Sequence, residues 1–407
     1  MSDHNELHCR RAIESLRSGV PNEDVITRLA SEQATIKDRY AELLDQARTF
    51  DTTKPSGMIV AGGFGTGKSH LLEELKHQAL QAGFAVSKIA VSKEVALDKP
   101  TKVMQAAIAN LEVRGCADNP LTEIVTRVRT DTPQFHAFRD WALSPSSTLA
   151  AVFPMSIALF QDIERTDLEA LDVLIRLWSG GTLQTSELKA IDPDLFRGMP
   201  LQAFPGQVAR ARQAATLVPR ILSLAGVTGW VILLDEIELI SRYGPLTRAM
   251  AYEQLAHWLG LDPRSRVEGL VTVATVTDDY SLAVLHVKND LENVPLRLEN
   301  HARQDRRDAA PHAVAAMTAI EHDAFELLPP GEAYISEVCE TVREMYETAY
   351  ACRVEPPLWS YLRGRPMRSY VRRWINEWDL RRFYSGRRVN LVEERVVLTY
   401  DEDDNND

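Results

Sequence analysis

The sequence has few cysteines and no long apolar run. Its four cysteines, Cys9, Cys116, Cys339 and Cys352, lie far apart among 407 residues and form no C-x-x-C pair. This spacing excludes a recognisable zinc site and is typical of a protein kept in a reducing cytosol. No apolar run approaches the roughly 18 residues that cross a bilayer, and the first residues form no secretory leader. We therefore expect a cytoplasmic protein without a membrane segment.

The overall charge is negative but unevenly distributed. The net charge is −12, with 45% hydrophobic and 26% charged residues, which excludes wholesale disorder. Five acidic residues lie in the last seven positions, 401–407, whereas residues 363–388 contain nine arginines against Glu377 and Asp379. Because a local basic face matters more than the global sign, −12 does not exclude a contact with nucleic acid.

Strand patterns alternate with helix patterns in the middle of the chain, which favours a parallel α/β sheet. Helices are expected within residues 1–50, over most of 100–228 and after Asn300. The expected strands are 58–62, 84–91, 230–234 and 269–276, and further helices are expected at 68–82 and 246–259.

The run Gly62-Gly-Phe-Gly-Thr-Gly-Lys-Ser fits the phosphate-binding pattern G-x-x-x-x-G-K-[ST]. A strand is expected before it and a helix after it, so backbone N–H groups and the helix N-terminus would form an anion cradle. Lys68 would neutralise the β- and γ-phosphates, and Ser69 would ligate Mg²⁺. The alternative is a glycine-rich turn with a chance Lys-Ser pair. The predicted nucleotide-binding residues are Gly62, Gly63, Phe64, Gly65, Thr66, Gly67, Lys68, Ser69 and His70.

A second acidic motif follows the expected strand at 230–234. Asp235 and Glu236 come directly after four apolar residues, the pattern of a Walker B element. We expect this strand to lie next to the first one, with Asp235 reaching the Mg²⁺ and Glu236 polarising the attacking water. Glu238 could cap the next helix or pair locally. The alternative is that both carboxylates are caps at a strand end.

Polar residues at the end of the 269–276 strand could contact the γ-phosphate and act as a sensor for it. Thr275, Thr277 and Asp278 are the candidates, and Thr277 is our assignment. The alternative is a solvent-facing threonine followed by an aspartate cap.

Two arginine groups could act on the phosphates or on a partner. Arg303, Arg306 and Arg307 could serve as a finger to a neighbouring subunit, although a solvated charge run is the commoner explanation. In the stretch Arg363–Arg388, Arg368 is our first candidate for a phosphate sensor and Arg365 the second, and the wider face could contact DNA or RNA phosphates. The alternative is a solvated helix face, and Trp374 and Trp378 are expected in the core.

Three segments resemble one known family. They are Gly62-Gly-Phe-Gly-Thr-Gly-Lys-Ser-His-Leu-Leu, Leu233-Leu-Asp-Glu-Ile-Glu-Leu-Ile-Ser-Arg-Tyr and Ala251-Tyr-Glu-Gln-Leu-Ala-His-Trp-Leu-Gly. They are similar to the P-loop ATP-binding proteins of bacterial BREX phage-defence loci, the BrxD-like proteins, as is the N-terminal Arg11-Ala-Ile-Glu-Ser-Leu-Arg-Ser-Gly-Val-Pro. That family resembles AAA+-type ATPases of the origin-recognition and helicase-loader kind. The resemblance implies ATPase roles for Lys68, Ser69, Asp235 and Glu236, and gives Arg242 and Tyr243 no mechanism.

The sequence therefore predicts an α/β P-loop NTPase with an AAA+-like parallel sheet, a helical insertion and a helical C-terminal lid. The expected units are helices at 1–50, an ATPase core at 51–310 with an insertion at about 114–228, a lid at 311–400 and an acidic tail at 401–407. The expected activity is hydrolysis of ATP with Mg²⁺, coupled to DNA or to a helicase partner in phage defence, in a possible homo-oligomer. The alternative is an ATP-dependent assembly switch, or a scaffold, with negligible turnover.

Overall fold

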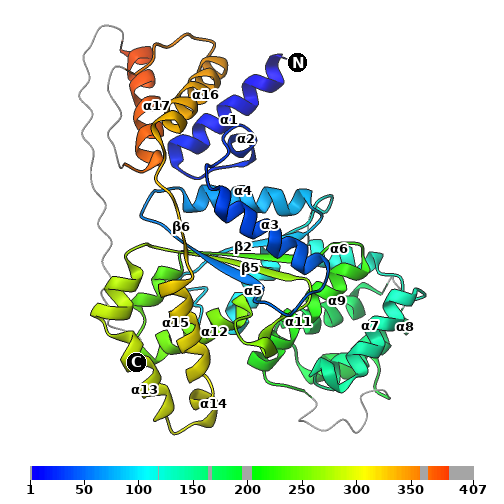
Figure 1. Ribbon diagram of the computed structural model, residues 1–407. Helices are drawn as coiled ribbons and strands as arrows, with labels where there is room; N and C mark the ends of the chain where they lie inside the picture. Colours follow the sequence, from blue (N-terminus) through cyan, green and yellow to red (C-terminus); the bar gives the residue numbers. More distant parts are fainter. Residues whose placement is uncertain (1, 118, 164–166, 195–203, 358–364, 385–407) are drawn as a thin grey trace.

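The structure is a computed structural model that describes residues 2–117, 119–163, 167–194, 204–357 and 365–384. A six-stranded sheet lies at its centre, with helices on both faces (Figure 1). The strand order is β3-β2-β4-β5-β1-β6, and every pairing is parallel except that of β2 with β3. The strands are β1 (Gly57–Ala61), β2 (Ala85–Ala90), β3 (Leu111–Glu112), β4 (Trp230–Asp235), β5 (Leu270–Val276) and β6 (Phe325–Glu326).

One expectation about the sheet is wrong. The strand that carries Asp235, β4, does not pair with β1, because β5 lies between them and pairs with both. Val60 on β1 is opposite Thr275 on β5, and Leu234 on β4 is opposite Ala274. A continuous apolar run indicates that a strand is buried on both faces. It does not indicate which strand lies next to it in the sheet.

Each strand sends alternate side chains to opposite faces of the sheet. Met58 and Val60 pack with α3 (Ala34–Arg48) and α4 (Lys68–Gln81) on one face. Ile59 and Ala61 belong to a larger cluster on the other face. That cluster includes buried residues of α5 (Pro100–Ala109), α11 (Gln207–Leu224), α12 (Pro245–Leu259) and α15 (Ala310–His322).

The chain between β3 and β4 is helical in its described residues, as expected. These helices form a lobe beside the sheet in Figure 1 and join its larger core cluster. They are α6 (Pro120–Arg127), α7 (Pro133–Leu143), α8 (Val152–Asp162), α9 (Leu168–Trp178), α10 (Thr185–Ile191) and α11, with the 3₁₀ helix η1 (Pro145–Ser147).

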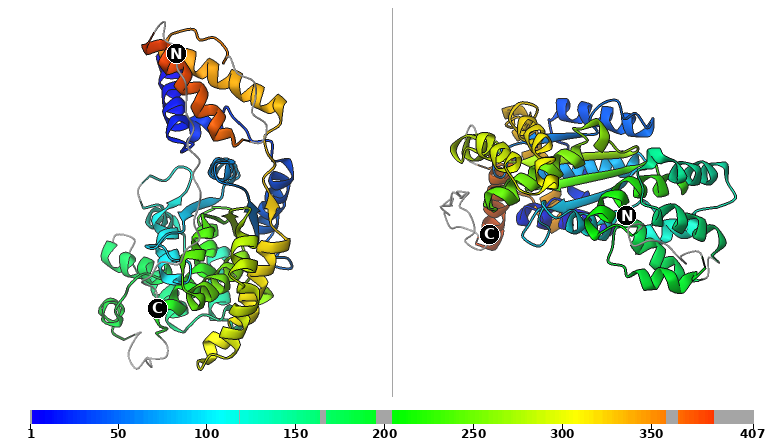
Figure 2. Two further views of the ribbon diagram at one scale, coloured as in Figure 1. Left: turned by 90° about the vertical axis from the view of Figure 1, so that its left-hand side faces the viewer. Right: turned by 90° about the horizontal axis from the view of Figure 1, so that it is seen from below.

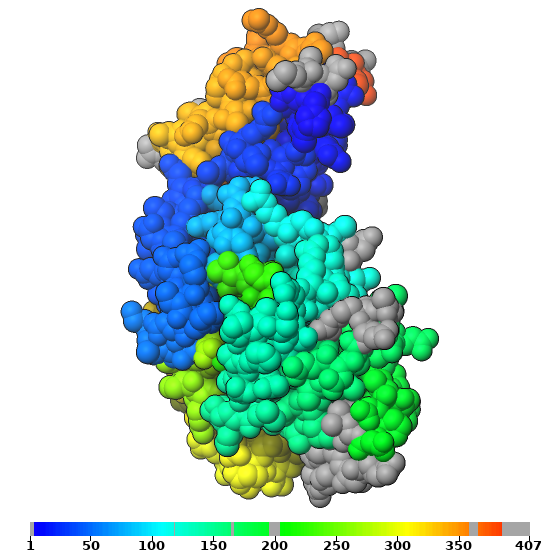
Figure 3. Space-filling view, turned by 90° about the vertical axis from the view of Figure 1, so that its right-hand side faces the viewer, coloured from blue at the N-terminus to red at the C-terminus, as the bar shows by residue number. Residues whose placement is uncertain are grey.

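The two ends of the described chain pack together. Ile13 on α1 (Ser2–Ser18) and Val25 on α2 (Glu23–Ile26) share a core with α16 (Glu332–Tyr350) and α17 (Met367–Phe383). These four helices stand at one end of the molecule (Figures 1 and 2), and α1 lies against α16 in the space-filling view (Figure 3). Trp374 and Trp378 are buried in this core, which confirms that expectation. We name α1, α2, α16 and α17 the terminal bundle.

The expected helical segment 1–50 is thus divided between two cores, since α1 and α2 join the terminal bundle and α3 joins the sheet. Residues 401–407, predicted to be an acidic tail, lie outside the described residues. The boundaries drawn from the sequence stay a prediction.

After β5 the chain is mostly helical, with one exception that the sequence did not predict. Leu327 N–H bonds the Ala61 carbonyl, and the two-residue strand β6 extends the sheet beyond β1. Such a short strand carries no periodic pattern. The remaining elements are the 3₁₀ helices η3 (Ile237–Arg242) and η4 (Pro263–Ser265), the π-helix η5 (Ser281–Val287), α13 (Asp290–Glu299) and α14 (Gln304–Arg307). In the described part of the chain, no helix is long and apolar enough to cross a membrane.

Candidate nucleotide-binding site

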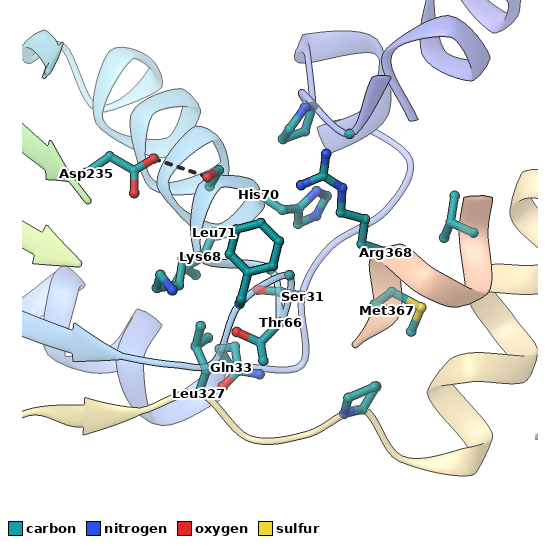
Figure 4. A pocket seen from close by; sticks show the side chains of 18 of the residues that line it. Ser31, Gln33, Thr66, Lys68, His70, Leu71, Asp235, Leu327, Met367 and Arg368 are labelled. Atoms are coloured by element: carbon teal, nitrogen blue, oxygen red, sulfur yellow. Dashed lines mark hydrogen bonds between the residues drawn. The ribbon is translucent and has the colours of Figure 1, made fainter. Parts of the chain in front are cut away.

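A cavity of about 380 Å³ lies between the sheet and the terminal bundle. The loop from Phe64 to Ser69 forms one wall, and the segment from Asp235 to Arg242 forms another. The terminal bundle closes the opposite side with Leu16, Val338 and Met367, among others. Figure 4 shows that the labelled side chains enter this space from the α2–α3 segment, the β1–α4 loop, α4, the end of β4, the segment after β6 and α17.

The glycine-rich loop takes the shape that its sequence predicts. Gly67 precedes α4 with φ of +115°, which a residue with a Cβ adopts only under strain. Thr66 Oγ1 donates to the Gly63 carbonyl at 2.8 Å and tightens the loop. Helix α4 then begins at Lys68, so its free N–H groups face the cavity, where an anion is favoured.

Lys68 is a buried cation that donates hydrogen bonds to backbone carbonyls. Its side chain is only 9% exposed, and Nζ donates to Gly62 O at 2.6 Å and to Gly63 O at 3.3 Å. Among the described residues, no carboxylate lies within ion-pair distance of this ammonium group. A buried charge without a counter-ion is costly, so this wall of the cavity favours an anionic ligand.

Asp235, Ser69 and Thr275 form a hydrogen-bonded group at the edge of the sheet. Ser69 Oγ donates to Asp235 Oδ2 at 3.1 Å, the dashed line in Figure 4, and Thr275 Oγ1 donates to Asp235 Oδ1 at 2.6 Å. The contact forms although β5 separates β1 from β4, because α4 crosses over the sheet and packs on β4. The predicted proximity of Ser69 and Asp235 is thus present in the structure.

Glu236 has a strained backbone and an exposed side chain at the cavity. Its φ of +61° and ψ of +39° are left-handed, a conformation that costs a non-glycine residue roughly 1–2 kcal/mol. Its N–H donates to Asp235 Oδ1 at 3.1 Å, which helps to hold this turn. Desolvation and the neighbouring Asp235 carboxylate raise the pKa of Glu236 above its ordinary value.

Glu238 also lines the cavity, which the sequence did not indicate. Its side chain is 7% exposed, and Oε2 has no hydrogen-bond partner among the described residues. Burial raises its pKa to about 7. The position of Glu238 close behind Asp235 and Glu236 could have indicated that it lies near the cavity. The sequence does not show, however, that the following turn is 3₁₀ rather than α-helical.

The residues assigned as sensors lie in two different places. Thr277 is buried at the end of β5 and is not among the residues that line the cavity, whereas Thr275 bonds Asp235 directly. Arg368 lines the cavity from the first turn of α17 and donates through Nη2 to Ser18 O at 3.2 Å. Figure 4 shows it extending toward the α1–α2 segment and His70, on the far side of the cavity from Lys68.

Two further residues of the predicted loop have clear environments. His70 lies on α4, its Nε2 is 2.9 Å from Leu29 O, and burial lowers its pKa. It therefore connects α4 to the terminal bundle. Phe64 is half-exposed at the cavity wall.

Residues 6–132 match the family described as BREX system ATP-binding protein BrxC/D. This segment of the chain is similar to the BrxC/D ATP-binding proteins. The match confirms the resemblance drawn from the sequence and contains the glycine-rich loop with Lys68 and Ser69. Asp235, Glu236 and Arg368 lie outside the matched residues. No curated protein and no solved structure matches the chain.

The arginine-rich segment of the chain makes many internal contacts. Arg372 donates from Nε to Arg17 O at 3.1 Å, beside the Arg368–Ser18 contact, so both arginines bind the C-terminal end of α1. Arg381 pairs with Glu377 at 2.6 Å, and Arg382 lies 3.8 Å from the Tyr350 ring centroid. Arg363, Arg387 and Arg388 lie outside the described residues. The predicted basic face is therefore partly engaged within the terminal bundle.

The other arginine group lies away from the cavity. Arg303 pairs with the exposed Asp305 at 2.7 Å, and Arg307 donates to Ala302 O at 2.9 Å. Neither these residues nor Arg306 line the cavity. Their proposed role as a finger to another subunit stays a prediction.

Proposed function

We propose that this chain is an AAA+-like ATPase of a bacterial BREX phage-defence system. The observation that carries the proposal is the buried Lys68 ammonium in a glycine-rich loop at the N-terminus of α4, beside the Ser69–Asp235 pair. β5 lies between the two motif strands, which supports an additional-strand P-loop core.

The cavity has an anionic-ligand end and an apolar end, which fits a nucleotide. Lys68 and the N–H groups at the start of α4 suit the phosphates. Leu29 and Val338, which belong to the core of the terminal bundle, line the other part of the cavity and suit the base. ATP is thus proposed to bind between the sheet and the terminal bundle.

The donor set at the phosphate end fits Mg²⁺. Ser69 Oγ and Asp235 Oδ2 are hard oxygen donors that are 3.1 Å apart. Among the described residues, no three His, Cys, Asp or Glu side chains could form a metal site alone, and Mg²⁺ is commonly held by one or two protein oxygens plus phosphates and water. When bound, Mg²⁺ would neutralise charge on the β- and γ-phosphates.

Glu236 is the proposed general base for hydrolysis. Its carboxyl group is exposed at the cavity, one residue beyond Asp235, so it can accept a hydrogen bond from a water that attacks the γ-phosphorus in line. The raised pKa brings it closer to the operating pH, which favours proton transfer. Lys68 would hold the β- and γ-phosphates during this step. Thr277 does not line the cavity, and its proposed sensor role is therefore a remote one. Arg368 is proposed to contact the phosphates.

The output of turnover is proposed to be movement of the terminal bundle, acting on DNA or on a helicase partner. The bundle closes the cavity, so nucleotide contacts on both sides would fix its position. The basic segment around Arg372, which is exposed in the structure, is the proposed DNA contact. A second function is an assembly switch with negligible turnover, favoured by the internal contacts of Arg368 and Arg372 with α1.

Steady-state and single-turnover ATP hydrolysis separate the two functions. For an ATPase, Glu236→Gln should lower the hydrolysis rate at least about 100-fold while ATP still binds, because only the base is removed. Glu299→Gln, an exposed change away from the cavity, is the control. Equal slow rates for wild type and Glu236→Gln would instead support the switch. Repeating the assay with duplex and single-stranded DNA tests the proposed partner.

A further inference from the structure

We infer that Arg242 contacts the terminal phosphate of the bound nucleoside triphosphate from within the same chain. This inference rests on the proposed function and adds a residue to it. Arg242 is the last residue of η3, the 3₁₀ helix that follows Glu236, and it lines the same cavity as Lys68 and Glu236.

The geometry of η3 places Arg242 on the cavity side. A 3₁₀ helix has three residues per turn, so positions three apart eclipse each other. Leu239 and Arg242 are three apart and both line the cavity, as does Glu236, the residue that precedes η3. Ile237 and Ile240 form another row, which is fully buried.

Arg242 lies near the proposed reaction centre, because it lines the same cavity as Lys68 and Glu236. The buried Arg248 pairs with Asp290, and the half-buried Arg368, which lines the same cavity, donates to Ser18 O. Within the described part of the chain, no hydrogen bond or ion pair engages the half-buried Arg242 guanidinium. Its donors are therefore available to a ligand in the cavity.

The end of η3 is held firmly enough to position this side chain. Lys288 Nζ donates to Ser241 O at 2.9 Å, and Arg248 Nη1 donates to Tyr243 O at 2.7 Å. The two carbonyls that flank Arg242 are thus fixed by cations from η5–α13 and α12. Tyr243 OH also donates to Ser92 O at 3.3 Å. Arg242 therefore extends from an anchored backbone.

The chemical role follows from the charge of phosphoryl transfer. Negative charge spreads over the terminal phosphate oxygens in the transition state, and a planar guanidinium can bind two of them at once. Lys68 approaches from the glycine-rich loop, and Arg242 would approach from the η3 side. The contact requires the terminal phosphate, so it should favour ATP over ADP.

The test compares the affinity of the full-length protein for Mg²⁺–ADP with its affinity for a Mg²⁺-bound ATP analogue whose imido bridge resists hydrolysis. Arg242→Ala should weaken binding of the analogue about tenfold and leave ADP binding unchanged. Arg242→Lys should give an intermediate ratio, because it keeps the charge and loses the planar fork. Arg264→Ala is the matched control, since Arg264 is exposed, pairs with Asp262 and does not line this cavity.

An analogue-to-ADP affinity ratio that is the same in wild type, Arg242→Ala and Arg242→Lys would overturn the inference, as would equal weakening of both nucleotides. Thermal unfolding shows whether each variant is folded. If Arg242→Ala does not fold, the affinity ratio of Arg242→Lys decides the test. The binding ratio needs no turnover. If wild type fails to hydrolyse ATP but the ratio falls in Arg242→Ala, the proposed hydrolysis fails and the phosphate contact stands.

Discussion

Glu238 is a buried carboxyl group whose Oε2 atom has no hydrogen-bond partner in the described structure. It lies three residues beyond Asp235 and lines the nucleotide cavity. Desolvation has the largest effect on its pKa, which rises from an ordinary 4.5 to about 7. Lys68 opposes this rise, whereas Glu236 and Asp235 add to it. The folded chain therefore keeps the Glu238 proton at a pH where the unfolded chain has released it.

This difference predicts a pH-dependent stability. Because the folded state holds the extra proton between pH 4.5 and about 7, the free energy of unfolding should fall as pH rises through that window. Glu238→Gln should flatten the profile and stabilise the nucleotide-free protein above pH 7 by at most roughly 3 kcal/mol. Urea unfolding at pH 5, 6, 7 and 8 measures this, with Glu299→Gln as the exposed control. Parallel profiles for wild type and Glu238→Gln would contradict it.

At the scale of elements, a buried ion pair joins α12 to α13 beside the candidate site. Arg248 Nη2 donates to Asp290 Oδ1 at 2.8 Å and Nε to Oδ2 at 2.9 Å, and the two side chains are 3% and 0% exposed. Tyr252 OH donates to Asp290 Oδ2 at 2.9 Å and lies 2.8 Å from Tyr280 OH. Every partner comes from α12, α13 or the segment after β5, so one carboxylate fixes three segments.

Removing that carboxylate should be strongly destabilising. Asp290→Ala removes the carboxylate that neutralises the buried Arg248 guanidinium, which is expected to cost about 3–5 kcal/mol of unfolding free energy. Because Arg248 also bonds Tyr243 O at the end of η3, ATP turnover of the folded variant should fall as well. Chemical unfolding measures the first effect. Asp131→Ala breaks the exposed Arg129–Asp131 pair and should leave the midpoint unchanged. Similar midpoints for the two variants would refute the argument.

At the scale of the whole molecule, the nucleotide cavity depends on how the terminal bundle sits on the sheet. Gln33 lies in the segment that connects α2 to α3, and its side chain is 9% exposed. Its Nε2 donates to Leu328 O at 3.1 Å, and Leu328 N–H donates to its Oε1 at 3.1 Å. This pair joins the segment between α2 and α3 to the segment between β6 and α16, the two connections between the sheet and the terminal bundle. Both residues line the cavity.

Breaking the Gln33 contact should loosen the cavity without touching the glycine-rich loop. Gln33→Ala leaves the Leu328 N–H and carbonyl without this partner, so we expect a loss of about 1–2 kcal/mol of stability. ATP affinity should weaken roughly tenfold, or about 1.4 kcal/mol, because the wall near the base is less ordered. Calorimetric titration measures this. Gln213→Ala removes a comparable bond to Ala150 N away from the cavity and should leave ATP affinity unchanged. Equal affinities for both variants would contradict the prediction.

Local sequence was enough to predict the elements that bear the phosphate-end chemistry. The glycine run before Lys68 and the apolar run before Asp235 are contiguous signals, because a tight anion cradle and a buried strand each need neighbouring residues of one type. The strands at β1, β2, β4 and β5 and the helices α4 and α12 therefore fall close to their expected ranges. The two-residue β6 had too few residues to form a pattern.

The arrangement of these elements depends on contacts between residues that are distant in the chain. Strand β5 lies between β1 and β4, α1 packs against α16 and α17, and the carbonyls at the end of α1 bind Arg368 and Arg372. Hydrophobic burial is not directional, so an amphipathic helix does not encode which partner covers it. The sequence by itself determined the residue types of the glycine-rich loop and of the Asp235–Glu236 pair, on which the proposed chemistry depends. Only the tertiary structure decided that η3 is a 3₁₀ helix whose Leu239 and Arg242 line the same cavity as Glu236, because its buried row at Ile237 and Ile240 packs against the core.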